Sequence, residues 1–256
     1  MYVYRPRIHR PEKGNRYYNN PGHGGINPCI DGKPMQDGLS VLNNCVGYAV
    51  GRYAEAAEAE KCILESTNAE NFITIAKKKG IPVSTLPHVG GILVWSKGKI
   101  GDGSDGAGHV AFVERMEHGN RLVTSESGWK SFTWKLINRS ESRGVKGNWG
   151  QPGTYKYLGC IINPAVVNPF NRPIITLKRG MKGDPIKWLQ WQLTACGYYL
   201  DIDGSFGGLT ESAVKCFQRD RSALVDGVAG RITKHLLTVG FWYDPEDLTD
   251  VRGVIV

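Results

Sequence analysis

Three residues of this sequence have the types and the order that cysteine-dependent amide hydrolysis requires. They lie in the segments Asn43-Asn44-Cys45-Val46-Gly47-Tyr48-Ala49, Gly108-His109-Val110-Ala111-Phe112-Val113 and Thr124-Ser125-Glu126-Ser127-Gly128-Trp129. A thiolate beside a neutral imidazole can attack an amide carbonyl, after which the ring protonates the leaving amine. We therefore expect Cys45 to be the nucleophile and His109 its base, with Glu126 holding the imidazole in the correct tautomer.

The elements that must position these side chains are readable as well. Apolar residues recur at helical spacing after the cysteine, at Val46, Ala49, Val50, Tyr53, Ala54 and Ala57. Cys45 thus falls in the first helical turn, where unpaired backbone N–H groups and the positive helix end lower a thiol pKa from about 8.5 toward neutrality. His109 starts a predicted strand, and Glu126 ends the strand that follows.

The other cysteines and histidines lack this setting. We interpret five cysteines as core or surface thiols, because none pairs a helix start with a downstream Gly-His-Val strand: Cys29, Cys62, Cys160, Cys196 and Cys216. Five histidines lie in loops or at element ends, which favours solvated or hydrogen-bonded rings: His9, His23, His88, His118 and His235. Only His109 lies in a run of β-branched residues.

With these motifs, residues 30–163 resemble the cysteine, histidine-dependent amidohydrolase/peptidase (CHAP) domain. The matching segments are Asn44–Ala49, Gly91–Trp95, Gly108–Glu114 and Ser125–Trp129. The resemblance implies a papain-like α+β fold, with helices packed on an antiparallel sheet. It also implies cleavage of peptidoglycan, either between muramic acid and L-alanine or within the peptide stem, by Cys45, His109 and Glu126. Relatives often carry an asparagine two residues after the orienting acid, where this sequence has Gly128.

The sequence offers little for a metal or another cofactor. Some CHAP relatives bind calcium just before the nucleophile, but Asp31 and Asp37 are the only carboxylates between residues 13 and 54. A Ca²⁺ site usually takes six to eight oxygens. A zinc-dependent amidase, the rival enzyme class, needs clustered ligands that six scattered histidines do not supply. We expect no metal and no cofactor.

Further candidates surround the predicted catalytic set. The oxyanion donors are predicted to be the Cys45 N–H and a side chain such as Asn43 or Asn44. Flat rings stack on sugars, so Tyr48, Trp95 and Trp129 are candidates for substrate binding. Tryptophans in a small α+β domain are, however, more often core residues.

Charge and composition restrict the class of protein. The chain has 256 residues, 41% hydrophobic and 22% charged, with a net charge of +8. Residues 1–163 carry 21 Lys and Arg against 14 Asp and Glu, and this excess attracts polyanions. Nucleic acid and the anionic teichoic acids of a bacterial wall are both candidates. No nucleic-acid-binding motif accompanies the charge, so the catalytic set favours the wall.

No apolar run approaches the ~20 residues of a membrane helix, and Met1–Arg7 lacks the apolar core of a secretory signal. We therefore expect synthesis in a host cytoplasm without a signal peptide, action on the cell wall, and no membrane partner. The oligomeric state does not follow from the sequence.

A second pattern begins after residue 163. Residues 164–175 hold three prolines without a period, as expected of a stiff linker that keeps two domains apart. A helix is predicted from Pro185 to Ala195, ending at Gly197. Asp203-Gly204 recurs 23 residues later as Asp226-Gly227, each pair followed by a threonine predicted to cap a helix.

Residues 176–238 resemble the three-helix type of peptidoglycan-binding domain. The segments that carry the resemblance are Leu189-Gln190 with Leu193, Gly197-Tyr198-Tyr199, Asp203-Gly204-Ser205-Phe206-Gly207, Ala213-Val214 with Phe217-Gln218, and Val225-Asp226-Gly227-Val228. The resemblance implies attachment to the wall rather than catalysis. Exposed aromatic residues, Tyr198 and Tyr199, are the candidates for wall contact.

The expected organisation is a catalytic domain over 1–163, a linker over 164–175 and a three-helix all-α domain with a tail over 176–256. The expected function is that of a phage or prophage endolysin that acts as an N-acetylmuramoyl-L-alanine amidase. An endopeptidase of the stem or cross-bridge and a non-catalytic wall-binding protein are the alternatives.

Overall fold

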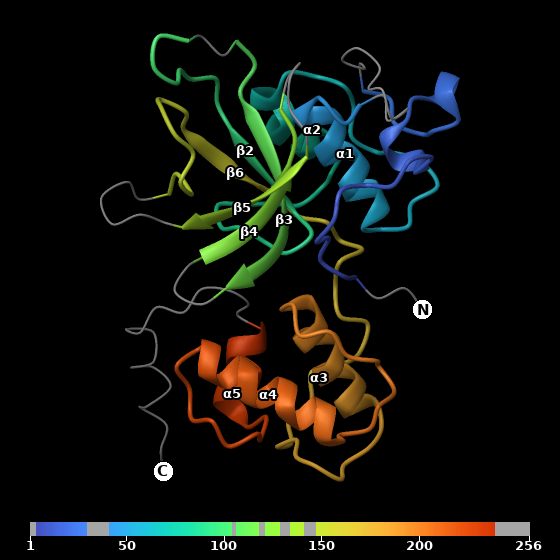
Figure 1. Cartoon of the computed structure of the whole chain (residues 1–256), viewed down its shortest axis with the longest axis vertical. Coiled ribbons are helices and arrows are strands. Elements are labelled where there is room, and N and C mark those ends of the chain that lie inside the picture. The colour runs from blue at the N-terminus through green and yellow to red at the C-terminus, as the bar shows by residue number, and fades with distance from the viewer. Residues whose placement is uncertain are drawn as a thin grey trace.

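The computed structural model describes residues 4–29, 41–103, 106–117, 121–128, 134–140 and 147–238. Figure 1 shows a sheet with helices beside it and, below, a separate group of three helices. The expected fold class, an α+β unit followed by a small helical unit, is confirmed.

One antiparallel sheet forms the centre of the first unit. Its strands are β1 (Val83–Ser84), β2 (Ile92–Trp95), β3 (His109–Glu117), β4 (Arg121–Glu126), β5 (Lys135–Ser140) and β6 (Tyr157–Ile161). Their order across the sheet is β1-β6-β2-β3-β4-β5, with every neighbouring pair antiparallel. All four residues of β2 are buried, which explains the continuous apolar run Ile-Leu-Val-Trp in a central strand. The two catalytic strands, β3 and β4, are direct neighbours.

Two α-helices cover the sheet (Figure 1). Helix α1 (Cys45–Glu55) packs on β3 and β4, and α2 (Phe72–Lys78) packs on β6 and β1. Nine consecutive residues of α1, Val46 to Ala54, are buried, so the helix lies inside the domain rather than on its surface. Short 3-10 turns lie at Arg16–Tyr18, Pro21–His23 and Ala69–Asn71.

The second unit consists of α3 (Asp184–Ala195), α4 (Gly208–Asp220) and α5 (Arg231–Thr238) around a core of its own. Its repeat has a physical basis in two buried glutamines. The Gln190 Nε2 donates to Asp203 Oδ1 at 2.7 Å, and its Oε1 accepts from the Gly204 N–H at 2.9 Å. Gln218 makes the equivalent bonds to Asp226, at 2.8 Å, and Gly227, at 2.9 Å.

The threonines of the repeat do not cap helices, which corrects the sequence-based expectation. Thr210 lies inside α4, whose N-cap residue Gly207 has no side-chain capping bond. The Thr210 Oγ1 instead accepts from Gln190 at 3.2 Å, and the Thr233 Oγ1 accepts from Gln218 at 3.1 Å. Each threonine therefore joins its helix to the preceding Asp-Gly turn.

The two units are in contact. Trp191 and Ala195 of α3 belong to the core of the first unit, where Trp191 is 5% exposed. The Tyr199 hydroxyl donates to the Pro6 carbonyl at 3.3 Å. Within the proline-rich segment, the Asn168 side chain donates to the Trp188 carbonyl at 2.9 Å. The two units are thus in direct contact and are not kept apart by the expected linker, while the boundaries at 163 and 176 stay predictions.

Among the described residues, no helix combines the length and the apolar character that crossing a membrane would require.

Candidate active site

Cys45 is the first residue of α1, as the sequence predicts. Asn44 is the N-cap residue, and its Oδ1 accepts from the N–H groups of Val46, at 2.9 Å, and Gly47, at 3.3 Å. This cap fixes the start of the helix one residue before the thiol. Cys45 is partly exposed, so the sulfur is held at a defined place and remains accessible.

His109 begins β3, directly after Gly108. Gly108 has φ +80°, and a Cβ at this position would lie 2.5 Å from the Trp95 carbonyl oxygen, so only glycine fits. Trp95 is the register partner of His109 on β2, and the two ring centroids lie 5.8 Å apart. The indole thus packs beside the imidazole.

Glu126, the last residue of β4, contacts His109 through Oε2 and Nε2. This contact leaves Nδ1 as the ring nitrogen that can serve the thiol, and Cys45 lies near enough to His109 to contribute to the raised pKa of the ring. The structure therefore brings the three predicted residues together in the order thiol, imidazole, carboxylate.

The protonation state of His109 follows from its neighbours. Burial alone would lower its pKa, but the Glu126 carboxylate and the hydrogen bond with Cys45 outweigh burial and raise the pKa to about 9. The imidazolium is thus the favoured form at neutral pH, where the sequence had led us to expect a neutral ring. The ring is charged rather than neutral because the Glu126 carboxylate lies in contact with it in a buried site.

A fourth residue, Arg139 of β5, was not identified from the sequence. Its Nη2 donates to both Glu126 oxygens, at 2.8 and 3.0 Å. Burial would raise the Glu126 pKa, but Arg139 and then His109 lower it to about 2. Glu126 is therefore a carboxylate throughout the physiological pH range, as orienting an imidazolium requires.

Arg139 is itself firmly held. Its Nε donates to Thr124 Oγ1 at 3.0 Å and its Nη1 to the Trp149 carbonyl at 3.2 Å. The guanidinium carbon lies 4.6 Å from the centre of the Trp95 ring. Arg139 is 3% exposed and is the one buried residue of β5. The sequence carried no signal for this role, because the burial of Arg139 is not readable from the letters of a strand whose other residues are exposed or half-buried.

Four of the remaining thiols have surroundings that suppress reactivity. All six cysteines are free. Burial raises the pKa of Cys62 and Cys196 to about 11 and that of Cys160 to about 12, and it raises the Cys29 pKa further still. These four thiols are protonated at neutral pH, which agrees with their interpretation as structural residues.

The structure bears differently on the predicted oxyanion donors and on the predicted substrate-binding rings. Asn43 is buried in the turn before α1, and Asn44 caps that helix, so their service as oxyanion donors stays a prediction. Tyr48 and Trp95 are fully buried. Their polar atoms bind Ser125 Oγ, at 2.7 Å, and the Asn148 carbonyl, at 3.0 Å. This corrects the expectation that they stack on substrate, because neither ring has an exposed face. Trp129 lies outside the described residues.

Tyr198 and Tyr199 share a pocket of about 570 Å³ that is formed by the second unit together with Arg5 of the first. The Tyr198 hydroxyl contacts Asp220, and its ring packs edge-on against Phe217. Tyr199 is 48% exposed. Tyr199 is thus the more accessible of the two wall-binding candidates.

In the part of the chain that the structure describes, no group of three or more His, Cys, Asp and Glu side chains is arranged to hold a metal ion.

Comparison with protein families gives two matches. Residues 35–128 match the model of the CHAP domain, and residues 182–237 match the model of a peptidoglycan binding domain. The first range includes Cys45, His109 and Glu126, and the second includes both repeats. No curated protein matches the chain.

Several solved structures match parts of the chain. The SleB N-terminal domain is 34% identical over 27% of this chain and 96% of its own, with a TM-score of 0.26. The Burkholderia AP3 phage endolysin is 37% identical over 31% and 32%, with a TM-score of 0.27. An N-acetylmuramoyl-L-alanine amidase from Staphylococcus aureus is 25% identical over 38% and 27%, with a TM-score of 0.29. The chain thus spans about a third of the endolysin and about a quarter of the amidase.

Proposed function

We propose that the bond cleaved by this CHAP-domain peptidoglycan hydrolase, which also carries a peptidoglycan-binding domain, is the amide between N-acetylmuramic acid and L-alanine. The chain of contacts from Cys45 through His109 and Glu126 to Arg139 carries the part of the proposal that an amide is cleaved, and product analysis decides which amide. These contacts supply a nucleophile, a proton donor and a fixed counter-charge, which amide cleavage needs.

The proposed roles follow from the charges in the site. The Cys45 thiolate attacks the carbonyl carbon of the lactyl group, and the developing oxyanion is held by the Cys45 N–H and by Asn43 or Asn44. The His109 imidazolium then gives its proton to the departing L-alanine nitrogen, leaving a thioester. Neutral His109 next takes a proton from water, whose oxygen attacks the thioester and releases Cys45. Glu126 and Arg139 act as positioning residues, because they touch the imidazole or its partner rather than the substrate.

Product analysis tests the choice of bond. Purified wall is digested, and the new amino termini are identified by mass spectrometry. Free L-alanine termini are expected; termini within the stem or cross-bridge would instead establish the endopeptidase alternative.

The nucleophile is tested separately by Cys45→Ser. We expect wall lysis to disappear while circular dichroism stays unchanged, because a serine hydroxyl cannot replace the thiolate. Thiol alkylation should inactivate the protein and EDTA should not. Lysis by the serine variant, or inactivation by EDTA alone, would contradict the cysteine mechanism and favour a metal-dependent hydrolase.

We also propose that the protein serves a phage or prophage as its endolysin. The pairing of a lytic domain with a wall-binding domain supports this role. Expression in the cytoplasm of a susceptible bacterium should cause lysis only when a second protein opens the membrane.

A further inference from the structure

Part of the positive charge of the first unit is concentrated at its N-terminal end. Residues 4–16 contain five cations, Arg5, Arg7, Arg10, Lys13 and Arg16, against one acid, Glu12. None of these side chains takes part in the catalytic contacts described above. The catalytic site therefore does not account for this cluster.

The structure places these cations around one pocket of about 790 Å³, here called the basic pocket. The six basic residues that line it are Arg5, Arg7, Arg10, Lys13, Arg16 and Arg52, and the three acids are Glu12, Glu55 and Glu58. Arg52 and Glu55 lie in the second half of α1. With a rise of 1.5 Å per residue, they are about 10–15 Å along the helix from Cys45, so the basic pocket is separate from the active site.

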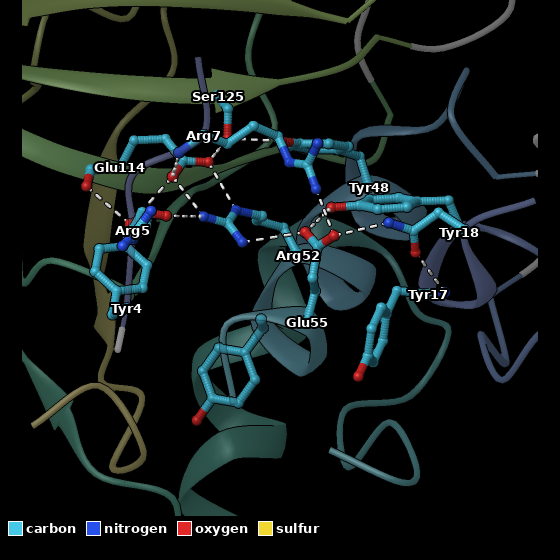
Figure 2. A network of polar contacts seen from close by, with 12 residues as sticks. Tyr4, Arg5, Arg7, Tyr17, Tyr18, Tyr48, Arg52, Glu55, Glu114 and Ser125 are labelled. Atoms are coloured by element: carbon cyan, nitrogen blue, oxygen red, sulfur yellow. Dashed lines mark hydrogen bonds and ion pairs between the residues drawn. The ribbon is translucent and has the colours of Figure 1, made fainter. Parts of the chain in front are cut away.

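A buried network fixes the floor of the basic pocket (Figure 2). Arg52 donates to both Glu114 oxygens at 2.9 Å and to Glu55 at 3.1 Å. The backbone N–H of Arg7 donates to Glu114 at 2.7 Å, and the Arg7 guanidinium contacts Glu55. Glu55 also accepts from Tyr18 at 2.8 Å. The floor acids are thus fully engaged, and they hold the N-terminal segment in place.

The rim of the pocket is less engaged. Among the described residues, the Arg5 and Lys13 side chains have no hydrogen-bond or ion-pair partner, and both are exposed. Arg16 pairs with Glu60 at 3.2 Å, but Glu60 is 90% exposed, so that ion pair is weak. The pocket therefore presents several available donors above a rigid base.

We propose that the basic pocket binds phosphodiester groups of an anionic wall polymer, an inference that rests on the proposed action on cell walls. Arginine binds phosphate oxygens through two parallel N–H bonds, and lysine adds a point charge. A fixed floor lowers the cost of ordering the rim around a ligand. The site would hold the catalytic unit against polymer that surrounds its substrate, independently of the peptidoglycan-binding domain.

The test measures binding of full-length Cys45→Ser protein to poly(glycerol phosphate) over a range of salt concentrations. The variant Lys13→Gln/Arg16→Gln removes two rim charges, while Arg5 is kept because it also lines the pocket near Tyr199. Lys77→Gln/Lys78→Gln is the matched control, since it removes two exposed charges from α2 of the same unit.

We expect the rim variant to bind on the order of tenfold more weakly, with a salt dependence that is shallower by roughly 1.4 in its logarithmic slope, because each lost phosphate contact removes about 0.7. The control should bind as the parent does. Equal losses in both variants would overturn the proposal in favour of general charge attraction.

Two competing polyanions complete the experiment. Poly-L-glutamate should bind more weakly than poly(glycerol phosphate), and a short DNA duplex should lose no more affinity in the rim variant than in the control. Equal binding of poly-L-glutamate would show that phosphate is not recognised. A rim-specific loss for DNA with none for the wall polymer would make the pocket a nucleic-acid site. Neither outcome bears on the bond cleaved, which is tested on soluble wall fragments that lack the polymer.

Discussion

At the scale of single residues, the site is a line of alternating charge. Arg139, Glu126 and His109 are in contact in that order, and Cys45 lies beside the histidine. Each charge is stabilised by the next, which allows His109 and Glu126 to remain charged where burial alone would disfavour their charged forms. The carboxylate is the centre of this arrangement, because both cations face it.

The substitution Glu126→Gln tests that arrangement. Glu126 is the largest contribution that raises the His109 pKa to about 9, and without it the buried Arg139 charge would repel the imidazolium. The parent should therefore lose activity as pH rises through about 9, when His109 can no longer protonate the leaving amine. In the variant this alkaline limit should move to lower pH, measured as kcat/KM on soluble wall fragments. An unchanged limit would show that another group sets it.

The same pKa shift predicts how stability depends on pH. Because folding raises the His109 pKa from 6.5 to about 9, its contribution is fully present below pH 6.5 and is lost as pH rises through about 9. The lowered Glu126 pKa contributes above pH 4.5, and that contribution is lost as pH falls toward 2.

Sequence reasoning could find the residues whose types are rare and whose neighbours are distinctive. A cysteine at a helix start and a histidine after glycine in a β-branched run meet that condition. Arg139 does not, because its role depends on the pairing of β4 with β5, which no local pattern specifies. Tyr48 and Trp95 failed as substrate candidates for a related reason. Neither the residue type nor, for Tyr48, proximity in sequence to Cys45 tells whether a ring faces solvent or the core.

At the scale of elements, the helical unit contains the same hydrogen-bonded contact twice. A glutamine on one helix binds the Asp-Gly turn that precedes the next helix, and a threonine completes the contact. The recurrence of Asp-Gly and threonine was visible in the sequence, but the glutamines precede the repeated segments and were not recognised as part of the repeat. The period was thus predictable, whereas the side chain that explains it was not.

Replacing Gln218 with leucine tests this contact. The change removes the acceptor of the Gly227 N–H. It also removes the amide donor to Asp226 Oδ1, the Val228 carbonyl and Thr233 Oγ1. We therefore expect the helical unit to lose about 2 kcal/mol of stability. Gln192→Leu is the control, since Gln192 makes one such bond, to the Leu237 carbonyl at 2.9 Å. Hydrogen exchange in α5 should speed up by about thirtyfold in the first variant. Equal effects of the two changes would contradict the network.

At the scale of the whole molecule, the two units pack against each other and are not joined only by a linker. Composition predicted a stiff, proline-rich connection, and the prolines are present as expected. Sequence alone could not show that Trp191 turns toward the first unit while Trp188, three residues earlier, lies in the core of the second. Docking fixes the position of Tyr199 relative to Cys45, so if Tyr199 binds the wall, attachment would also orient the active site.

The substitution Trp191→Ala should separate the units. A compact chain of this length has a radius of gyration of about 18 Å, and small-angle scattering should show an increase when the tryptophan is removed. Leu224→Ala, which truncates a side chain that is 79% exposed on the same unit, is the control. A radius unchanged by Trp191→Ala would mean that the remaining contacts, such as Tyr199 with Pro6, suffice to hold the units.

Separating the two units also tests whether the second unit orients the active site on the wall or only tethers the enzyme to it. A flexible tether raises the local substrate concentration whatever the relative orientation of its two ends, so a tethered Trp191→Ala protein would still digest sedimented wall well. If docking aims the active site, the variant should keep its rate on soluble fragments and lose several-fold on sedimented wall. If the variant matches the parent on both substrates, attachment alone is sufficient, and the packing of Trp191 serves stability only.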